Sequence, residues 1–296
     1  MTTAHAIAFC SRLTKAHSST FYLGSRLFPK QQRDAVHAVY AMCRSGDDAV
    51  DECADALQGQ QRLAQWWQHV EHAYADQPRS NEPLEVALHW ALQHYSIPKA
   101  AFEELYMGFK TDLQLNSCYE SQAMADMDAL MTYCRRVAGV VGFMVAPIAG
   151  YRGGDETLQQ ALALGQAMQL TNILRDVGED LGRSRCYLPK DKLQVYAVDI
   201  PALQRGVISE GYVALLEDLT GVAHSLYRQG WQGIPKLHGS AAVAVGVAAL
   251  NYEGILRKLR QNHYDNLTRR AYLKTHERLV LIPQAVYSVY STSLMH

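Results

Sequence analysis

The segment TLQQALALGQAMQLTNILRDVGEDLGR, residues 157–183, predicts a long helix that is apolar around most of its circumference. A helix of this kind is normally buried. One stripe along it is different, advancing by four, three, four and four residues: Gly165, Gln169, Asn172, Asp176 and Asp180. These steps place the stripe on one helix face. Because carboxylates are rarely buried unless they are paired or bind a metal, we predict a functional site on this helix.

A second acidic segment lies in a helix predicted over residues 29–55. Four residues recur there at steps of four, three and four and share one face: Tyr40, Arg44, Asp47 and Asp51. Asp47 and Asp51 are about 6 Å apart along such a helix, where like charges repel each other. Taken alone, this segment fits a solvated acidic face as well as a ligand-binding face.

Two such helices, facing each other across a bundle, would offer several oxygen ligands without histidine or cysteine. This donor set suits Mg²⁺, and Mn²⁺ as a substitute, because these cations bind a few carboxylates, water and phosphate oxygens. The chain contains no G-x-x-x-x-G-K-[ST] motif, which disfavours a nucleoside triphosphate. We therefore predict a Mg²⁺-dependent site for a diphosphorylated molecule.

Composition limits the other possibilities. The chain has 296 residues, of which 48% are hydrophobic and 19% charged, and its formal net charge is −1. These values are typical of a soluble globular protein and give no global basic field for nucleic acid. Six cysteines without a C-x-x-C pair favour reduced thiols, and residues 1–12 do not resemble a signal peptide. We expect a cytoplasmic protein.

Helical periodicity extends along the whole chain, and no alternating strand pattern is present. Helix breaks are predicted at residues 28–29, 77–83, 150–155, 188–189 and 230–239. No repeat or long flexible linker divides the sequence. We predict an all-α protein of eight to ten helices, with residues 1–296 forming a single domain.

Cations that could bind a diphosphate occur in several places. Arg44, Arg175 and Arg185 lie in or beside the two acidic segments, and residues 257–278 contain seven Lys or Arg residues. Arginine binds phosphate oxygens bidentately. A solvated basic face that contacts anionic lipid is an alternative interpretation of the C-terminal group.

The apolar segment YCRRVAGVVGFMVAPIA, residues 133–149, contains small residues that permit close helix packing. It would also suit the wall of an apolar channel, with Tyr133 at its start, if the diphosphate carries a hydrocarbon chain. Both interpretations stay open. No metallopeptidase histidine motif and no Ser or Cys nucleophile motif is present.

Four motifs together are similar to the squalene and phytoene synthase family: HSSTFY at 17–22, YAMCRSGDDAVDE at 40–52, YCRRVAGVVG at 133–142 and QLTNILRDVGEDLGRSRCYLP at 169–189. The tail at 251–283 resembles the end of the bacterial phytoene-forming members. The resemblance covers most of the chain, and the fourth motif is the most specific.

The resemblance implies a helical isoprenoid synthase fold with a central cavity, and it implies roles by position. The implied metal ligands are Asp47, Asp51, Asn172, Asp176 and Asp180. The implied diphosphate contacts are Ser18, Thr20, Arg44, Arg175, Tyr252 and Arg269. The implied prenyl-channel residues are Val137, Ala138, Val141, Gly142 and Gln169. Tyr133 is the implied residue for proton handling or cation stabilisation. Thr20 and Ser184 depart from the serine and glycine usual in the family.

The implied reaction is the Mg²⁺-dependent head-to-head condensation of two geranylgeranyl diphosphates to phytoene, through a cyclopropylcarbinyl diphosphate. This is the first committed step of carotenoid biosynthesis and needs no NADPH. Formation of squalene or dehydrosqualene from two farnesyl diphosphates is the alternative. A non-catalytic helical assembly factor and a chain-elongating prenyltransferase are remote alternatives. The hydrocarbon product suggests peripheral contact with the inner face of a membrane.

Overall fold

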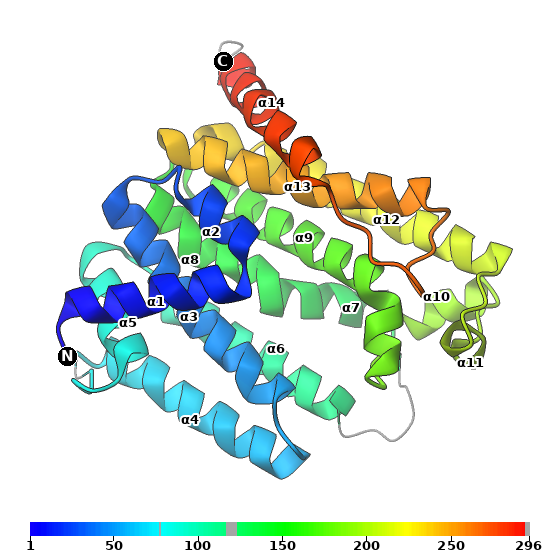
Figure 1. Cartoon of the computed structure of the whole chain (residues 1–296), viewed down its shortest axis with the longest axis horizontal. Coiled ribbons are helices and arrows are strands. Elements are labelled where there is room, and N and C mark those ends of the chain that lie inside the picture. Colours follow the sequence, from blue (N-terminus) through cyan, green and yellow to red (C-terminus); the bar gives the residue numbers. More distant parts are fainter. Residues whose placement is uncertain (77, 117–122, 294–296) are drawn as a thin grey trace.

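The computed structural model of the chain describes residues 1–76, 78–116 and 123–293, without the side chains of residues 19, 20, 292 and 293. These residues form fourteen α-helices and no β-strand, as Figure 1 shows. The α-helices are α1 (Thr3–His17), α2 (Ser19–Ser25), α3 (Lys30–Asp51), α4 (Ala56–Tyr74), α5 (Pro83–His94), α6 (Lys99–Asn116), α7 (Met127–Cys134), α8 (Val140–Ala149), α9 (Gly154–Gly182), α10 (Lys190–Val195), α11 (Ile200–Gln204), α12 (Glu210–Trp231), α13 (Ser240–Gln261) and α14 (Thr275–Ser293). A π-helical segment, η1 (Arg135–Gly139), joins α7 to α8, and a 3₁₀ turn, η2 (Ile234–Lys236), precedes α13.

The all-α prediction is confirmed, but the predicted number of eight to ten helices is too low. The difference comes from short helices such as α2, α10 and α11, which have seven, six and five residues. Helices this short complete fewer than about two turns, so they produce no apolar periodicity in the sequence. The predicted breaks coincide with helix boundaries, although residue 77 lies outside the described residues.

Helix α9 is the central element of the fold. It packs against α12, α13, α8 and η1, and Figure 1 shows it running through the middle of the bundle. It begins three residues before the predicted start, where Asp155 and Glu156 in its first turn stabilise the helix N-terminus. Its apolar faces are buried, as the pattern of residues 157–183 predicts.

The buried apolar residues form two clusters rather than one. The first follows α9, α12 and α13 and includes Leu170, Leu174 and Tyr227. The second follows α3, α4, α6 and α8 and includes Met42 and Phe102. Helices α3 and α9, which carry the two predicted acidic faces, therefore belong to different halves of the apolar interior.

Residues 127–149 form one continuous helix, because η1 connects α7 directly to α8. Among the described residues, this is the one helix long and apolar enough to cross a membrane by length and composition. It packs against α6, α9 and α3 inside the bundle, which is the position of a core helix.

Two glycines allow this helix to approach α9 with direct backbone contact. A Cβ atom at Gly165 of α9 would lie 2.4 Å from the carbonyl oxygen of Ala138, and one at Gly142 would lie 2.6 Å from that of Ala161. These distances leave no room for a side chain. The Cβ side of Gly142 therefore faces the α9 backbone, and its place in a channel wall stays a prediction. We call Gly142 and Gly165 the glycine seam.

A buried carboxylate ties α4 to α5 far from this seam. The Glu85 side chain is 0% exposed and accepts hydrogen bonds from His69 (2.8 Å), His72 (3.2 Å) and the Arg79 guanidinium (2.9 and 2.5 Å). Burial alone would raise the pKa of Glu85, but the hydrogen bonds from Arg79 and the two histidines outweigh it and lower the pKa to about 2.

Replacing Glu85 by glutamine is expected to lower the free energy of unfolding at pH 7 by about 3 kcal/mol, because it leaves buried donors without a charged acceptor. Since the folded-state pKa of Glu85 lies below its usual 4.5, its contribution is present above about pH 5 and is lost as the pH falls towards 2. Urea denaturation from pH 7 to pH 3 measures the difference between Glu85→Gln and wild type. The exposed Glu71, 3.9 Å from Lys99, supplies the control Glu71→Gln, which should change stability by less than about 0.5 kcal/mol. Equal effects of the two substitutions would contradict the prediction.

Candidate active site

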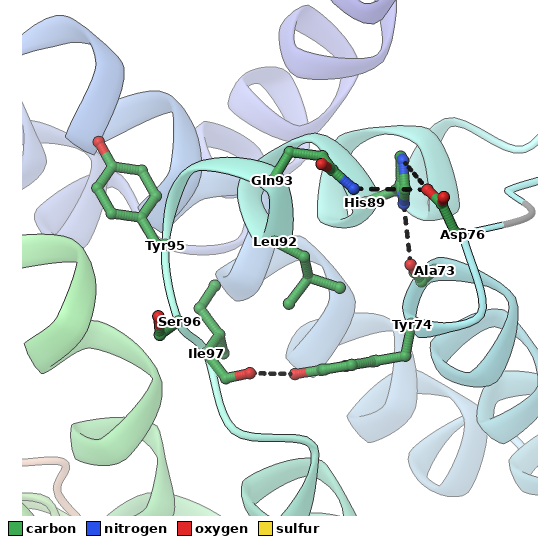
Figure 2. Close-up of a pocket in the computed structure, with 9 residues that line it drawn as sticks. All are labelled: Ala73, Tyr74, Asp76, His89, Leu92, Gln93, Tyr95, Ser96 and Ile97. Carbon is green, nitrogen blue, oxygen red and sulfur yellow. Dashed lines mark hydrogen bonds and ion pairs between the residues drawn. The ribbon is translucent and has the colours of Figure 1, made fainter.

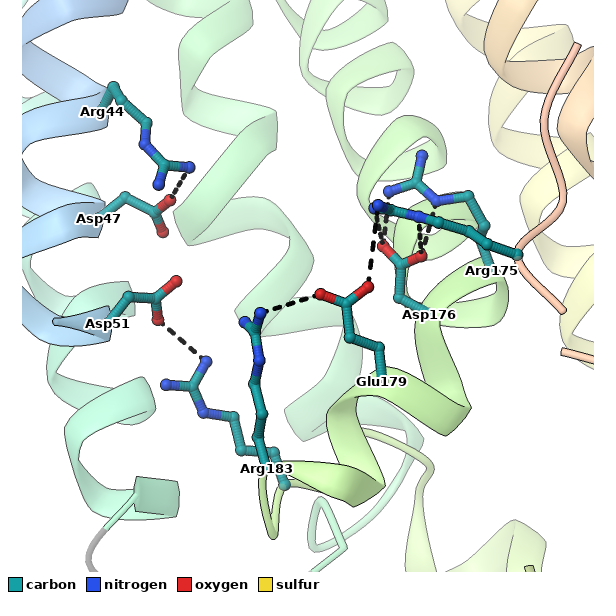
Figure 3. Close-up of polar contacts among 9 residues, drawn as sticks. Arg44, Asp47, Asp51, Arg175, Asp176, Glu179 and Arg183 are labelled. Atoms are coloured by element: carbon teal, nitrogen blue, oxygen red, sulfur yellow. Dashed lines mark hydrogen bonds and ion pairs between the residues drawn. The ribbon is translucent and has the colours of Figure 1, made fainter. Parts of the chain in front are cut away.

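The first acidic face lies on the C-terminal half of α3. Arg44 pairs with Asp47 at 2.9 Å and also contacts Asp48, one turn further along the helix. Asp51 accepts a hydrogen bond of 2.9 Å from Arg185, which lies in the loop after α9. Figure 3 shows Asp47 and Asp51 projecting from α3 towards α9. The predicted helix over residues 29–55 ends at Asp51, so the site occupies its last two turns.

The second acidic face lies on α9. Asp176 is held between two guanidinium groups, those of Arg175 (2.8 and 2.5 Å) and Arg270 (2.9 and 3.1 Å). One turn on, Glu179 pairs with Arg183 at 2.9 Å. Figure 3 shows Asp176 and Glu179 on the opposite side of the site from Asp47 and Asp51. The structure therefore brings the two predicted acidic faces together.

Negative charge accumulates between the two helices. Burial and the neighbouring Asp51 raise the pKa of Asp47 to about 6. Burial and the neighbouring Asp176 raise the pKa of Asp180 to about 7, although Arg185 and Arg183 act in the opposite direction. Carboxylates that repel one another in this way favour the arrival of a compensating cation.

The available donors fit a hard divalent cation. The Oδ1 atom of Asn172 is buried and has no hydrogen-bond partner among the described residues, while its Nδ2 atom donates to Gln169 at 3.4 Å. An unpaired buried carbonyl oxygen beside carboxylates is the ligand chemistry of Mg²⁺. Within the part of the chain that the structure describes, no three acidic, His or Cys side chains converge on one point. The predicted oxygen ligands thus form two groups, one on α3 and one on α9.

Two further residues of the predicted diphosphate contacts lie near Tyr40, one turn before Arg44 on α3. Ser18 caps α2 by accepting a hydrogen bond of 3.3 Å from Phe21. Burial raises the pKa of Tyr40, on which Arg44, Tyr252 and Ser18 also act, so these groups share one region. The side chain of Thr20 lies outside the described residues. Ser18 and Tyr252 therefore stay candidates for this contact.

A segment without helix, residues 264–274, crosses α9 and is named here the C-terminal strap. Figure 1 shows it as the orange to red trace between α13 and α14. Asn266 anchors it, since its side chain donates to the Leu174 carbonyl (2.6 Å) and its carbonyl accepts from the Gly178 amide (3.1 Å). The strap brings Arg270 to Asp176.

Arg269 pairs within the strap rather than with the acidic face of α9. Its side chain is 75% exposed and lies 3.6 Å from Asp265, within the strap itself. Its neighbour Arg270 makes the contact with the acidic face of α9. The sequence places two arginines side by side, and only the path of the strap decides which one faces the site.

The predicted channel residues lie where η1 meets α8. Val137, Ala138 and Val141 are half-buried although their helix is central, so they border accessible space rather than the filled core. Gln169 of α9 is also half-buried. Their function as a channel wall stays a prediction.

Tyr133 is buried at the end of α7, beside residues that sequence reasoning missed. Its hydroxyl donates to Asp112 (2.8 Å), and the hydroxyl of Tyr187 donates to the same carboxylate oxygen (2.9 Å). Tyr187 belongs to the RSRCYLP motif and could have been proposed from it. Asp112 stands eight residues after Glu104, the nearest preceding acidic residue of α6, and belongs to no motif, so no sequence signal points to it.

A separate cavity of about 260 Å³ lies between the ends of α4 and α5, shown in Figure 2. Its polar groups are already paired: His89 contacts the Ala73 carbonyl (3.0 Å) and Asp76 (3.2 Å), and Tyr74 donates to the Ile97 carbonyl (2.9 Å). None of the predicted site residues lines it. We assign it no function.

Residues 14–277 match the squalene/phytoene synthase family, and the chain belongs to this family. It is 50% identical to a phytoene synthase of Thermus thermophilus over 275 residues, which cover 93% of this chain and 90% of the relative. It is 34% identical to a 15-cis-phytoene synthase of Synechococcus elongatus, covering 94% of this chain and 91% of the relative.

Solved structures agree with the family. A dehydrosqualene synthase in complex with a ligand superposes with a TM-score of 0.86 and 29% identity, covering 98% of both chains. The squalene synthase HpnC from Alicyclobacillus acidocaldarius gives a TM-score of 0.80 at 23% identity, covering 88% of this chain and 95% of that one. The helical isoprenoid synthase architecture predicted from the motifs is thereby confirmed.

Proposed function

We propose that the chain is a phytoene synthase, which joins two molecules of geranylgeranyl diphosphate head to head and releases diphosphate. The observation that carries this proposal is the 50% identity to a phytoene synthase over 93% of the chain. The two facing acidic helices support it, because their carboxylates would provide the metal site that the chemistry needs. Residues 1–296 would act as one isoprenoid synthase domain.

The metal in this proposal is Mg²⁺. Asp47 and Asp51 on α3 would hold it together with Asn172, Asp176 and Asp180 on α9. When bound, Mg²⁺ supplies positive charge that stabilises the departing diphosphate. The unpaired Oδ1 atom of Asn172 supports this assignment most directly.

Arginines of the chain would contact the diphosphate, and apolar side chains would surround the hydrocarbon. Arg44, Arg175 and Arg270 lie at the acidic faces, where their planar guanidinium groups suit bidentate contact with phosphate oxygens. Val137 and Val141 would border the hydrocarbon and exclude water, which would otherwise convert a carbocation into an alcohol.

The substrate is amphipathic and the product is a hydrocarbon, so we include reversible contact with a membrane surface. Helix α14 supports this, because it buries one stripe and leaves Leu279, Val280 and Tyr287 exposed at 64%, 63% and 74%. Flotation with anionic liposomes should carry the protein upwards. A protein that stays at the bottom of the gradient at low salt would argue against the contact.

The proposed reaction is tested by a product assay. Purified protein and Mg²⁺ are incubated with geranylgeranyl or farnesyl diphosphate, with and without NADPH, and the extracted hydrocarbon is identified by mass. We expect a C40 hydrocarbon that forms without NADPH. No product from either diphosphate would overturn the proposal of an enzyme and favour a non-catalytic helical protein.

Synthesis of a C30 hydrocarbon is the second candidate. The observation that favours it is the superposition on a dehydrosqualene synthase at 29% identity over nearly the whole chain. A C30 product in the same assay would establish this function, and its dependence on NADPH would distinguish squalene from dehydrosqualene.

The two neighbouring arginines of the strap make a matched pair for testing the diphosphate contact. Arg270→Ala is expected to raise KM for the prenyl diphosphate about tenfold, because a charge-assisted contact near the acidic face is lost. Arg269→Ala should change KM less than about twofold, because Arg269 is 75% exposed and faces Asp265. Steady-state kinetics at saturating Mg²⁺ measure both. A larger effect at Arg269 would restore the original assignment.

A further inference from the structure

Asp112 of α6 is a buried carboxylate whose hydrogen-bond partners in the structure are two phenols. The residue is 5% exposed. One of its oxygens, Oδ1, accepts from Tyr133 at 2.8 Å and from Tyr187 at 2.9 Å. The two phenol rings are stacked, with centroids 5.1 Å apart and an angle of 25° between their planes. A single oxygen atom thus fixes the direction of both hydroxyl groups.

The three residues come from three separate elements. Asp112 lies in α6, Tyr133 at the end of α7 and Tyr187 in the loop that follows α9. Two residues before Tyr187, Arg185 forms the ion pair with Asp51 on α3. The same loop therefore connects the buried phenols to the first acidic face.

Burying the Asp112 carboxylate lowers the stability of the fold, because the charged group loses its hydration. Burial raises the pKa of Asp112 to about 7, and the hydrogen bonds from the two phenols only partly oppose this shift. An apolar side chain in the same place would avoid the desolvation of a carboxylate. The geometry therefore indicates that the carboxylate has a use besides stability.

We propose that Asp112 is a positioning residue, which sets the orientation of the Tyr133 hydroxyl for the reaction at the neighbouring site. The proposal rests on the proposed function. Because the hydrogen of Tyr133 is donated to Asp112, the phenol presents its oxygen lone pairs, and not its hydrogen, to any other group that approaches. Lone pairs attract a carbocation, whereas a hydroxyl hydrogen would repel it. The stacked Tyr187 donates to the same carboxylate oxygen and so helps to hold it in place.

The test is a double-mutant cycle of Asp112→Asn and Tyr133→Phe. Asparagine has nearly the same shape as aspartate but carries an NH₂ group and no charge, so it no longer dictates that both phenols donate to it. Each single variant is expected to lower kcat on the order of 10²-fold. KM for the prenyl diphosphate should stay within about twofold, because the ion pairs of Arg44, Arg175 and Arg270 at the acidic faces are with other carboxylates. The double variant should be no slower than the slower single variant, since Asp112 acts through Tyr133.

Matched controls lie outside the site. Glu85→Gln alters another buried carboxylate, and Tyr74→Phe removes the hydrogen bond of a half-buried phenol, that to the Ile97 carbonyl (2.9 Å). Both are expected to lower thermal stability and to leave kcat unchanged at temperatures where the protein is folded. A fall in kcat for these controls as large as that for Asp112→Asn would mean that the effect at Asp112 is structural only.

Two results would overturn the proposal: an unchanged kcat in Asp112→Asn, or effects of Asp112→Asn and Tyr133→Phe that multiply in the double variant. If Asp112→Asn does not fold, Tyr187→Phe replaces it, because it removes one donor and keeps the Asp112–Tyr133 bond. It should lower kcat less than about tenfold, and its effect should vanish in the Tyr133→Phe background.

The proposed function is tested separately by the wild-type product. If the wild type forms a C40 product but the effects of Asp112→Asn and Tyr133→Phe on kcat multiply, only the proposed role of Asp112 is rejected. Absence of any wild-type product removes the proposed function and with it the reaction that Asp112 would serve.

Discussion

Replacing Asp176 by asparagine is expected to lower kcat/KM on the order of 10³-fold, the largest effect we predict for a single side chain. Asp176 lies at the centre of the second acidic face and is contacted by Arg175 and Arg270. Asparagine preserves the shape but removes the charge, so a metal ligand is weakened and two guanidinium groups lose their shared partner. Both changes act on stabilisation of the departing diphosphate.

The measurement is product formation at increasing Mg²⁺ concentration. The Asp176→Asn variant should need more Mg²⁺ for half-maximal rate as well as losing rate at saturation. Glu179→Gln is the matched control on the same helix, since Glu179 is 43% exposed, lies outside the predicted ligand set, pairs with Arg183 at 2.9 Å and approaches Arg270 only to 3.8 Å. It should retain activity within about threefold. Equal losses in both variants would show that net charge, rather than a ligand at position 176, is what the site requires.

The second large effect is expected at the glycine seam. A Cβ atom at Gly165 would lie 2.4 Å from the Ala138 carbonyl oxygen and 2.8 Å from the Gly139 Cα atom. These are backbone atoms, which cannot rotate away as a side chain would. Gly165→Ala should therefore push η1 away from α9 and lower the free energy of unfolding by about 3 kcal/mol.

A matched glycine on α12 separates this steric effect from helix propensity. Gly221 is exposed in mid-helix, and a Cβ atom there would meet nothing within 4 Å. Gly221→Ala should therefore raise stability by about 0.5–1 kcal/mol. Urea denaturation of both variants gives the comparison. A Gly165→Ala protein as stable and active as the wild type would contradict the prediction, because it would show that η1 and α9 can move apart without loss of stability.

The polar faces of α9 and α3 were predictable because their residues recur at the helical steps of three and four. A polar stripe at steps of three and four on an apolar helix has few explanations, and the structure places Asn172, Asp176 and Asp180 on the face that the spacing requires. The same holds for Asp47 and Asp51 on α3. In these helices, backbone geometry converts sequence spacing directly into position.

Other parts of the site depend on tertiary contacts, which the spacing of residues in the sequence does not predict. The strap has no regular structure, so its sequence could not decide between Arg269 and Arg270. Asp112 meets Tyr133 and Tyr187 only because tertiary packing brings α6 to the end of α7 and to the loop after α9. Gly142 shares a segment with Val141, yet its Cβ side is directed at α9. Such placements result from tertiary packing between segments far apart in the chain.

The contact between Arg270 and Asp176 also has a consequence for synthesis. The two residues are 94 positions apart, and at about 5–20 residues per second a ribosome adds Arg270 roughly 5–20 s after Asp176. Throughout that interval the nascent chain carries both acidic helices without the arginine of the strap. The ion pair between Arg270 and Asp176 is therefore among the last contacts of the molecule to form.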